Sequence, residues 1–290
     1  MKNLINNTRV KALALLVGLS CTGANAGIIV NFGGQAATDG SGITSSLVNA
    51  NNSQDASSGL FIETFDIGTP VTDVNGIIPG GLGAADTSYN YNAAATAAGC
   101  GVNTLGASGI NFSTTGGGFA VGIGNILNTA AQPGNGNPAI EDTTCYGFTP
   151  AAGSSGTVTI DYTGFLANLG GGALIDYFGF YWGSVDNYND FTFFDSVAGT
   201  SATILGQTLL NLQNGSSGNQ SDPSSNAYVN ITFDNGFAFD SVMVNSTGIA
   251  GEFDNVVTGL NNRPNVPEPA SLAIFGLGLI GIALTRRQRK

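Results

Sequence analysis

The sequence predicts an all-β protein, an antiparallel β-sandwich of jelly-roll-like arrangement, between residues 27 and 262. The 290 residues include 44 glycines, and with abundant serine, threonine and asparagine this composition is typical of many turns and short strands. Only 9% of the residues are charged, too few for the Lys–Glu pairs that stabilise exposed helix faces. Several short runs alternate between apolar and polar residues. About 240 residues are enough for one sizeable core, so we expect a single domain.

The first 26 residues have the pattern of a secretory signal peptide. Three basic residues precede an apolar stretch at 12–19, and Ala24 and Ala26 form the A-x-A pattern of a cleavage site before Gly27. We therefore expect export through the Sec machinery and a mature chain that starts at Gly27. Two weaker alternatives are a retained anchor, for which the apolar stretch is too short, and lipidation at Cys21.

The strands of the sandwich are predicted from alternating runs. Between 158 and 162, and again between 229 and 233, the apolar residues share one face while polar residues take the other, as in half-buried strands. Asn235 and Gly236 tolerate positive φ and predict a hairpin between the strands on either side. The predicted strands are 27–32, 60–65, 157–162, 174–182, 190–194, 228–233, 237–244 and 252–258, with one or two helical turns at 93–98 and Gly-, Ser- and Asn-rich loops at 33–59, 71–109 and 211–226.

The charge distribution excludes several classes of function. Residues 12–262 contain no Lys or Arg, and the chain has no histidine. Between residues 27 and 265, eighteen Asp and Glu stand against Arg263 alone, which gives a formal charge of −17. Nucleic-acid binding is therefore not expected, because phosphate neutralisation needs basic side chains. Catalysis that uses histidine, lysine or a zinc site is equally disfavoured, and only a carboxylate pair remains as an enzymatic option.

Cys100 and Cys145 are the two cysteines that remain after signal cleavage. In an oxidising compartment we expect them to form a disulfide. In the loop-entropy model such a bond stabilises the fold by roughly 3 to 4 kcal/mol. A reactive thiol is the weaker alternative, because no basic neighbour is available to activate it.

The segment 176–190 is rich in aromatic residues and holds the only tryptophan, Trp182. Aromatics on a strand usually pack in the core and across neighbouring strands, and we expect this of most residues from Tyr177 to Trp182. A second interpretation gives Trp182 or Tyr188 an exposed role, in which the ring stacks on the apolar face of a sugar.

Polar residues near the end of this segment offer oxygen atoms to a ligand. Asp186, Asn187 and Asp190 could bond sugar hydroxyls or hold Ca²⁺, which prefers hard oxygen ligands, although they would serve equally well as turn residues. Calcium is thus the one cofactor that the sequence suggests. Asp240, Glu252 and Asp254 are a further candidate set for calcium.

Residues 263–290 combine three features of a membrane-delivered sorting signal. A proline-bounded motif comes first, and the apolar run 270–284 follows as an expected hydrophobic helix of about one thin bilayer span. Basic residues end the chain and are expected to stay cytoplasmic. The motif consists of Val266, Pro267, Glu268 and Pro269, and the basic tail of Arg286, Arg287, Arg289 and Lys290.

This tail resembles the PEP-CTERM sorting signal of Gram-negative bacteria through Pro267, Glu268 and Pro269. The resemblance implies cleavage by a membrane-embedded exosortase, so the chain would contact the inner membrane transiently and only through this segment. Release to the cell surface or the extracellular space would follow. The Tyr-Trp-Gly-Ser stretch from Tyr181 and the Phe-Asp-Asn-Val stretch from Phe253 also resemble the C-terminal half of a recurring exosortase-dependent surface-protein domain, which implies location and fold but no activity.

We therefore expect a non-enzymatic, exported protein of the cell surface or extracellular matrix that associates with biofilm exopolysaccharide. Two alternatives remain open. One is a secreted glycoside-active enzyme, which would need two carboxyl groups about 5 to 10 Å apart across a groove. The other is a purely structural coat component without a ligand-sized pocket.

Overall fold

The computed structural model describes residues 27–53, 58–66, 86–102, 109–170, 172–234 and 236–261. The predicted signal peptide, the sorting signal at 263–290 with its hydrophobic helix, and Asn235 of the predicted hairpin lie outside the described residues. Within the described ranges, no helix combines the length and the apolar character needed to cross a membrane.

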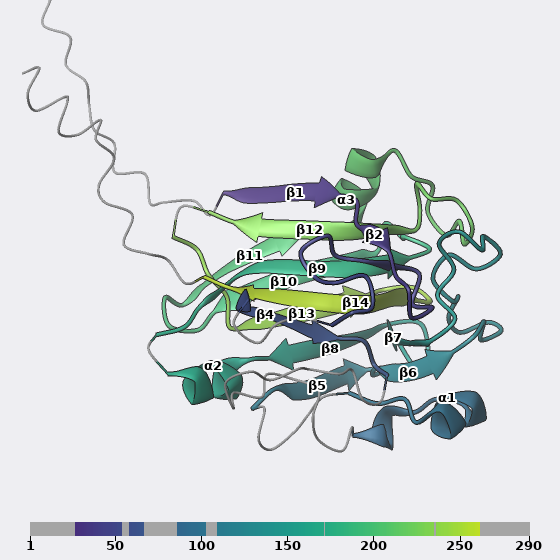
Figure 1. The fold of residues 1–290 in the computed structure, drawn as a ribbon, viewed down its shortest axis with the longest axis horizontal. Coiled ribbons are helices and arrows are strands. Elements are labelled where there is room, and N and C mark those ends of the chain that lie inside the picture. The colour runs from purple at the N-terminus through teal and green to yellow at the C-terminus, as the bar shows by residue number, and fades with distance from the viewer. Residues whose placement is uncertain are drawn as a thin grey trace, which may run out of the picture.

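Two antiparallel sheets packed against each other make up most of the described chain (Figure 1). The larger sheet has the order β1-β12-β9-β14-β7-β6. One edge of its long strand β14 pairs with β7 near the start of β14 and with β4 near its end. In order, these strands are β1 (Ile28–Phe32), β12 (Ala227–Phe233), β9 (Ile175–Gly183), β14 (Gly251–Leu260), β7 (Cys145–Thr149), β6 (Ala120–Ile123) and β4 (Leu60–Glu63). The second sheet consists of β11 (Thr200–Ile204), β10 (Asn189–Asp195), β13 (Ser241–Ser246), β8 (Gly156–Asp161) and β5 (Asn111–Gly116).

Short elements complete the described fold. The two-residue strands β2 (Gln35–Ala36) and β3 (Ile43–Thr44) pair with each other, and the helices are η2 (Thr87–Tyr89), α1 (Ala93–Ala98), α2 (Thr163–Leu169) and α3 (Gly206–Gln213). The predicted helix at 93–98 is confirmed as α1. The Asn92 side chain accepts a hydrogen bond from the Ala95 N–H at 2.8 Å, and Gly99, with φ of 76°, ends the helix.

All eight predicted strands are present within a few residues of their expected ends, whereas the sequence pattern predicts none of the six other strands in the described chain. In β7 all five residues are buried, so no alternation marks it. In β5 only Phe112 is buried, so the strand is almost entirely polar in appearance. The strands β6 and β11 have only four and five residues, and β2 and β3 lie in a stretch predicted to be a loop.

The predicted hairpin around Gly236 is wrong. The strand before it, β12, pairs with β1 and β9 in the larger sheet, while the strand after it, β13, pairs with β10 and β8 in the second sheet. The chain therefore crosses from one sheet to the other at this point. Turn residues permit a reversal of direction, but they do not determine which sheet receives the next strand.

The sandwich core is aromatic, and the larger sheet is buried on both faces. On β9 the inward residues Phe178, Phe180 and Trp182 belong to the core between the sheets. The outward Tyr177 and Tyr181 belong to a second cluster that also contains Ile62, Val48, Tyr228 and Val257. Segment 33–53, which includes β2 and β3, covers this outer face, and Figure 1 shows it in front of β9 and β14.

A β-bulge in β14 holds this covering segment in place. Pairing with β9 shifts register between Asp254 and Val257, and Asn255 has φ of 49°. The Asn255 side-chain amide donates to the carbonyl oxygens of Ser41 at 2.9 Å and Ile43 at 3.0 Å. Asp254, next to Asn255 in this bulge, is fully buried.

Candidate functional site

Trp182 lies in the core of the sandwich. Its side chain is 1% exposed, and its ring centroid lies 6.0 Å from that of Phe180 and 5.4 Å from that of Phe191. The expectation of core packing is met for the inward aromatics of β9. The alternative role of Trp182 as a sugar platform is corrected, because the indole presents no face to solvent.

Tyr188 lies near the surface, in the turn between β9 and β10. Its side chain is half-buried, and its hydroxyl lies 2.7 Å from Asp186 Oδ2 and 2.8 Å from the carbonyl oxygen of Ile249. Burial and the neighbouring Asp186 carboxylate raise the pKa of the Tyr188 phenol. Tyr188 thus remains available at the surface, with its hydroxyl oriented by an acid.

The structure does not bring Asp186, Asn187 and Asp190 together as a calcium site. Asp186 is buried and accepts hydrogen bonds from Tyr188 and, at 2.6 Å, from Ser217 Oγ. Asp190 Oδ1 accepts from the Gly206 N–H at 3.0 Å, where α3 begins, and Asn187 is exposed. Each residue has a separate role, so the turn interpretation is favoured over the calcium triad.

A hollow of about 360 Å³ opens beside the start of β14. Ser184, Asp186, Tyr188 and Glu252 line it, together with residues 125–131. Ser184 has φ of 37°, an uncommon backbone conformation for a non-glycine residue that is often found at functional sites. The hollow is therefore lined by two acids, one phenol and a serine in an uncommon backbone conformation.

Glu252 is held firmly within this hollow. It is 1% exposed; its Oε1 accepts from the Ala131 N–H at 2.7 Å and its Oε2 from Ser184 Oγ at 2.9 Å. Burial raises the pKa of Glu252 to about 8, against the opposing effect of these hydrogen bonds. Burial also raises the pKa of Asp186. A raised pKa favours the protonated form of the Glu252 carboxyl group, which is the form that a general acid needs.

A second group of acids lies deeper, under the cover of the larger sheet. It consists of Asp66 after β4, Asp142 before β7 and Asp254 on β14. Burial raises the pKa of Asp66 to about 6 and that of Asp142 to about 7. Burial, together with the charges of the other two acids, raises the pKa of Asp254 well above its usual value.

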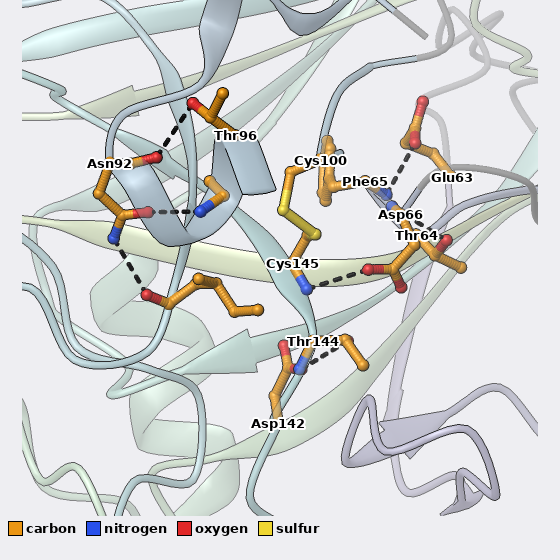
Figure 2. The surroundings of a disulfide bond; sticks show 12 residues. Glu63, Thr64, Phe65, Asp66, Asn92, Thr96, Cys100, Asp142, Thr144 and Cys145 are labelled. Atoms are coloured by element: carbon orange, nitrogen blue, oxygen red, sulfur yellow. Dashed lines mark hydrogen bonds between the residues drawn. A yellow bond between two sulfur atoms is a disulfide. The ribbon is translucent and has the colours of Figure 1, made fainter. Parts of the chain in front are cut away.

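The predicted disulfide between Cys100 and Cys145 is present and adjoins this acid group. It links the residue just after α1 to the first residue of β7, with Cα atoms 5.8 Å apart. Figure 2 shows the bond with Asp66 beside it, where Asp66 Oδ1 accepts from the Cys145 N–H at 3.1 Å.

Sequence reasoning did not identify the hollow or the role of Asp142. One signal was available for β14, where Glu252 and Asp254 stand two positions apart in an otherwise largely apolar strand and so share a face. No comparable signal marks Asp142, which lies in a loop of turn-forming residues.

Comparison with known families and proteins gives one finding about the tail. Residues 265–290 match the family described as the PEP-CTERM protein-sorting motif. A search of curated proteins found no match to the chain. The chain thus carries a PEP-CTERM sorting motif at its C-terminus, which implies processing by an exosortase, export and sorting to the cell surface.

Proposed function

We propose that the protein is a non-enzymatic component of the cell surface or extracellular matrix that associates with exopolysaccharide. The observation that carries this proposal is the sorting motif at 265–290. The last described strand, β14, ends at Leu260, directly before the sorting signal. Cleavage at the motif would therefore release the sandwich without cutting into it.

The composition of the sandwich supports a role without catalysis. Residues 27–262 contain no Lys, Arg or His, so the described part of the chain lacks the side chains that most hydrolases and transferases use. Its large aromatics pack in the core, and its disulfide suits an oxidising environment.

For the fold we infer the jelly-roll topology. From β7 to β14 each strand passes to the opposite sheet, except that β10 and β11 form a hairpin within the second sheet. Such alternation between two packed sheets is the pattern that a double Greek key produces.

The test of the proposed function follows the full-length chain in a host that has an exosortase. Combined substitution of Pro267, Glu268 and Pro269 by alanine should leave the protein in the membrane fraction with its basic tail attached. The paired change Asn262→Ala and Pro264→Ala, just upstream, is the control and should leave sorting to the surface intact. Wild-type protein that stays in the membrane fraction would contradict the proposal.

A carboxylate-dependent glycoside-active enzyme is the second candidate. The observation in its favour is that two carboxyl side chains, Asp186 and Glu252, line one hollow large enough for a sugar unit. Retaining and inverting hydrolysis both need such a pair, one as acid and one as base or nucleophile.

Hydrolysis assays on a panel of exopolysaccharides decide between the two functions. If the enzyme exists, Glu252→Gln and Asp186→Asn should each reduce turnover by at least about a hundredfold. Asp234→Asn, at an exposed acid away from the hollow, is the matched control. A wild-type protein that binds polysaccharide without cleaving it supports the non-enzymatic role.

A further inference from the structure

Three carboxylate oxygens are buried beneath the cover of the larger sheet. Asp142 and Asp254 are both 0% exposed. Asp142 Oδ1 accepts hydrogen bonds from the backbone N–H and the hydroxyl of Thr144, both at 2.8 Å. Asp142 Oδ2 and both oxygens of Asp254 accept no hydrogen bond from the described residues. The Asn255 N–H lies close to the Asp254 carboxylate but without the geometry of a hydrogen bond.

Nothing of opposite charge among the described residues compensates these oxygens. The two carboxyl groups lie within hydrogen-bonding reach of each other, and Asp66 is near enough for its charge to act on both. Residues 27–262 contain no Lys, Arg or His. A buried carboxylate without a partner is strongly destabilising, so it must take up a proton or a cation.

A shared proton accounts for only part of this arrangement. One proton between the two groups would join Asp142 Oδ2 to one oxygen of Asp254. The other oxygen of Asp254 would still have no donor among the described residues. A cation, in contrast, can bind all three oxygens at once.

We propose that Asp142 and Asp254 bind one Ca²⁺ ion. Carboxylate oxygens are the ligands that hard divalent cations prefer, and two carboxylates balance the charge of the ion. Among the described residues, no group of three or more His, Cys, Asp or Glu side chains has metal-binding geometry. The remaining positions of an ion with about six to eight ligands therefore belong to backbone carbonyls and water.

The ion would join segments that are far apart in the sequence. Asp254 belongs to β14, while Asp142 precedes β7, whose first residue forms the disulfide. Next to Asp254, Asn255 holds the covering segment through Ser41 and Ile43. A cation that binds only the folded chain would stabilise all three segments by mass action.

Calcium titration of the full-length chain tests the proposal. The protein is purified in detergent, stripped of metal with a chelator, and followed by calorimetry and thermal unfolding as CaCl₂ is added. We expect one Ca²⁺ per chain and a rise in Tm of roughly 5 °C or more once calcium exceeds its Kd about 100-fold. Asp254→Asn and Asp142→Asn should each abolish this rise. In chelator they should unfold no lower than wild type, because each replaces a buried carboxyl group that is costly to ionise with a neutral amide.

Asp240→Asn is the matched control. Asp240 is also buried with one unpartnered oxygen, but its Oδ2 is bonded by the Ser196 N–H at 2.9 Å, and it lies outside the acid group. This variant should keep the full calcium response.

Several outcomes would overturn the proposal. These are an unchanged Tm up to about 10 mM calcium, an equal rise in Asp254→Asn, and an equal rise with MgCl₂. If the variants do not fold, wild-type protein with Tb³⁺ replaces them. Emission excited through the neighbouring Tyr181 and displaced by Ca²⁺ supports the site, and its absence overturns it.

Discussion

Asp186 and Asp254 show how surroundings decide the role of a buried carboxylate. Asp186 accepts short hydrogen bonds from the hydroxyls of Ser217 and Tyr188. Asp254 accepts none from the described residues. Hydrogen bonds to a carboxylate offset much of its desolvation, so Asp186 can remain buried as a turn residue. The unpartnered Asp254 is instead a candidate ligand.

Asp186→Asn should change the pH dependence of stability. Burial raises the pKa of Asp186 in the folded protein above its usual 3.8. Between the ordinary pKa of aspartate and the raised pKa of Asp186, the folded chain keeps a proton that the unfolded chain has lost. The free energy of unfolding of wild type therefore falls as pH rises through this range. Asparagine does not titrate; its Oδ1 can accept one of the two hydrogen bonds, and its NH2 group can donate to the other hydroxyl.

Urea unfolding at several pH values measures this effect. The free energy of unfolding of Asp186→Asn relative to wild type should increase as pH rises above the ordinary pKa of aspartate. The exposed Asp234→Asn provides the control for removing a carboxyl group at the surface. A difference between Asp186→Asn and wild type that stays constant with pH would contradict the proposed environment of Asp186.

Residue burial could be predicted only where one face of a strand meets solvent. In β8 the alternation of 158–162 predicts the inward residues, and the structure confirms them. In β14 every residue except the last is buried, because other segments cover its outer face. Segment 33–53, which provides much of that cover, is rich in Gly, Ser and Asn and has no hydrophobic period. Nothing in its pattern could therefore indicate that Asp254 would be enclosed.

At the scale of elements, the disulfide fixes a segment that has little apolar content of its own. Helix α1 consists of five alanines and one threonine, and only Ala95 is buried. The chain just before it runs beside β6, where the Tyr91 N–H donates to the Val121 carbonyl oxygen at 2.8 Å. Bonding Cys100 to β7 secures this region to the edge of the larger sheet.

Removing the disulfide should lower stability substantially. The bond closes a loop between cysteines 45 positions apart, for which the loop-entropy model gives a loss of roughly 3 to 4 kcal/mol. Chemical unfolding of the Cys100→Ser, Cys145→Ser double variant measures this loss. Reductant should destabilise wild type by a similar amount and leave the variant unchanged. Equal stability of wild type with and without reductant would contradict the prediction.

The sequence predicts where strands and helices occur more reliably than it predicts which strands pair with each other. The long aromatic strand β9 and the capped helix α1 carry strong local signals. The partners of β12 and β13 do not, because the burial of Phe237 and Phe239 in the core decides that the chain crosses between the sheets. Such a choice depends on contacts with strands distant in sequence.

At the scale of the whole molecule, the signal-peptide pattern and the sorting motif each predict one processed end. In a host with an exosortase, the mature protein should start at Gly27 and end close to Pro267, Glu268 and Pro269. The apolar run 270–284 is marginal as a permanent anchor, which favours cleavage over retention. Intact-mass analysis of native protein measures both ends. A mass that includes residues 286–290 would indicate a plain C-terminal anchor instead.

The acidity of the whole exported region predicts that association with an anionic polysaccharide depends on divalent cations. Between residues 27 and 265, eighteen acids stand against one arginine, a formal charge of −17. Two negative polymers repel each other, and the domain has almost no basic side chains to offset this. Cations that bridge carboxylates are then the available source of attraction.

Surface binding assays with hyaluronan as an anionic probe and dextran as a neutral one test this dependence. Binding to hyaluronan should appear in calcium and disappear in excess chelator, whereas any binding to dextran should not follow calcium in this way. Asp254→Asn separates two routes to the result. If exposed acids form the bridge, the variant binds as wild type does, because Asp254 is buried. If the buried ion shapes the binding surface, the variant loses binding even in calcium. Undiminished binding to hyaluronan in excess chelator would show that charge repulsion does not control this association.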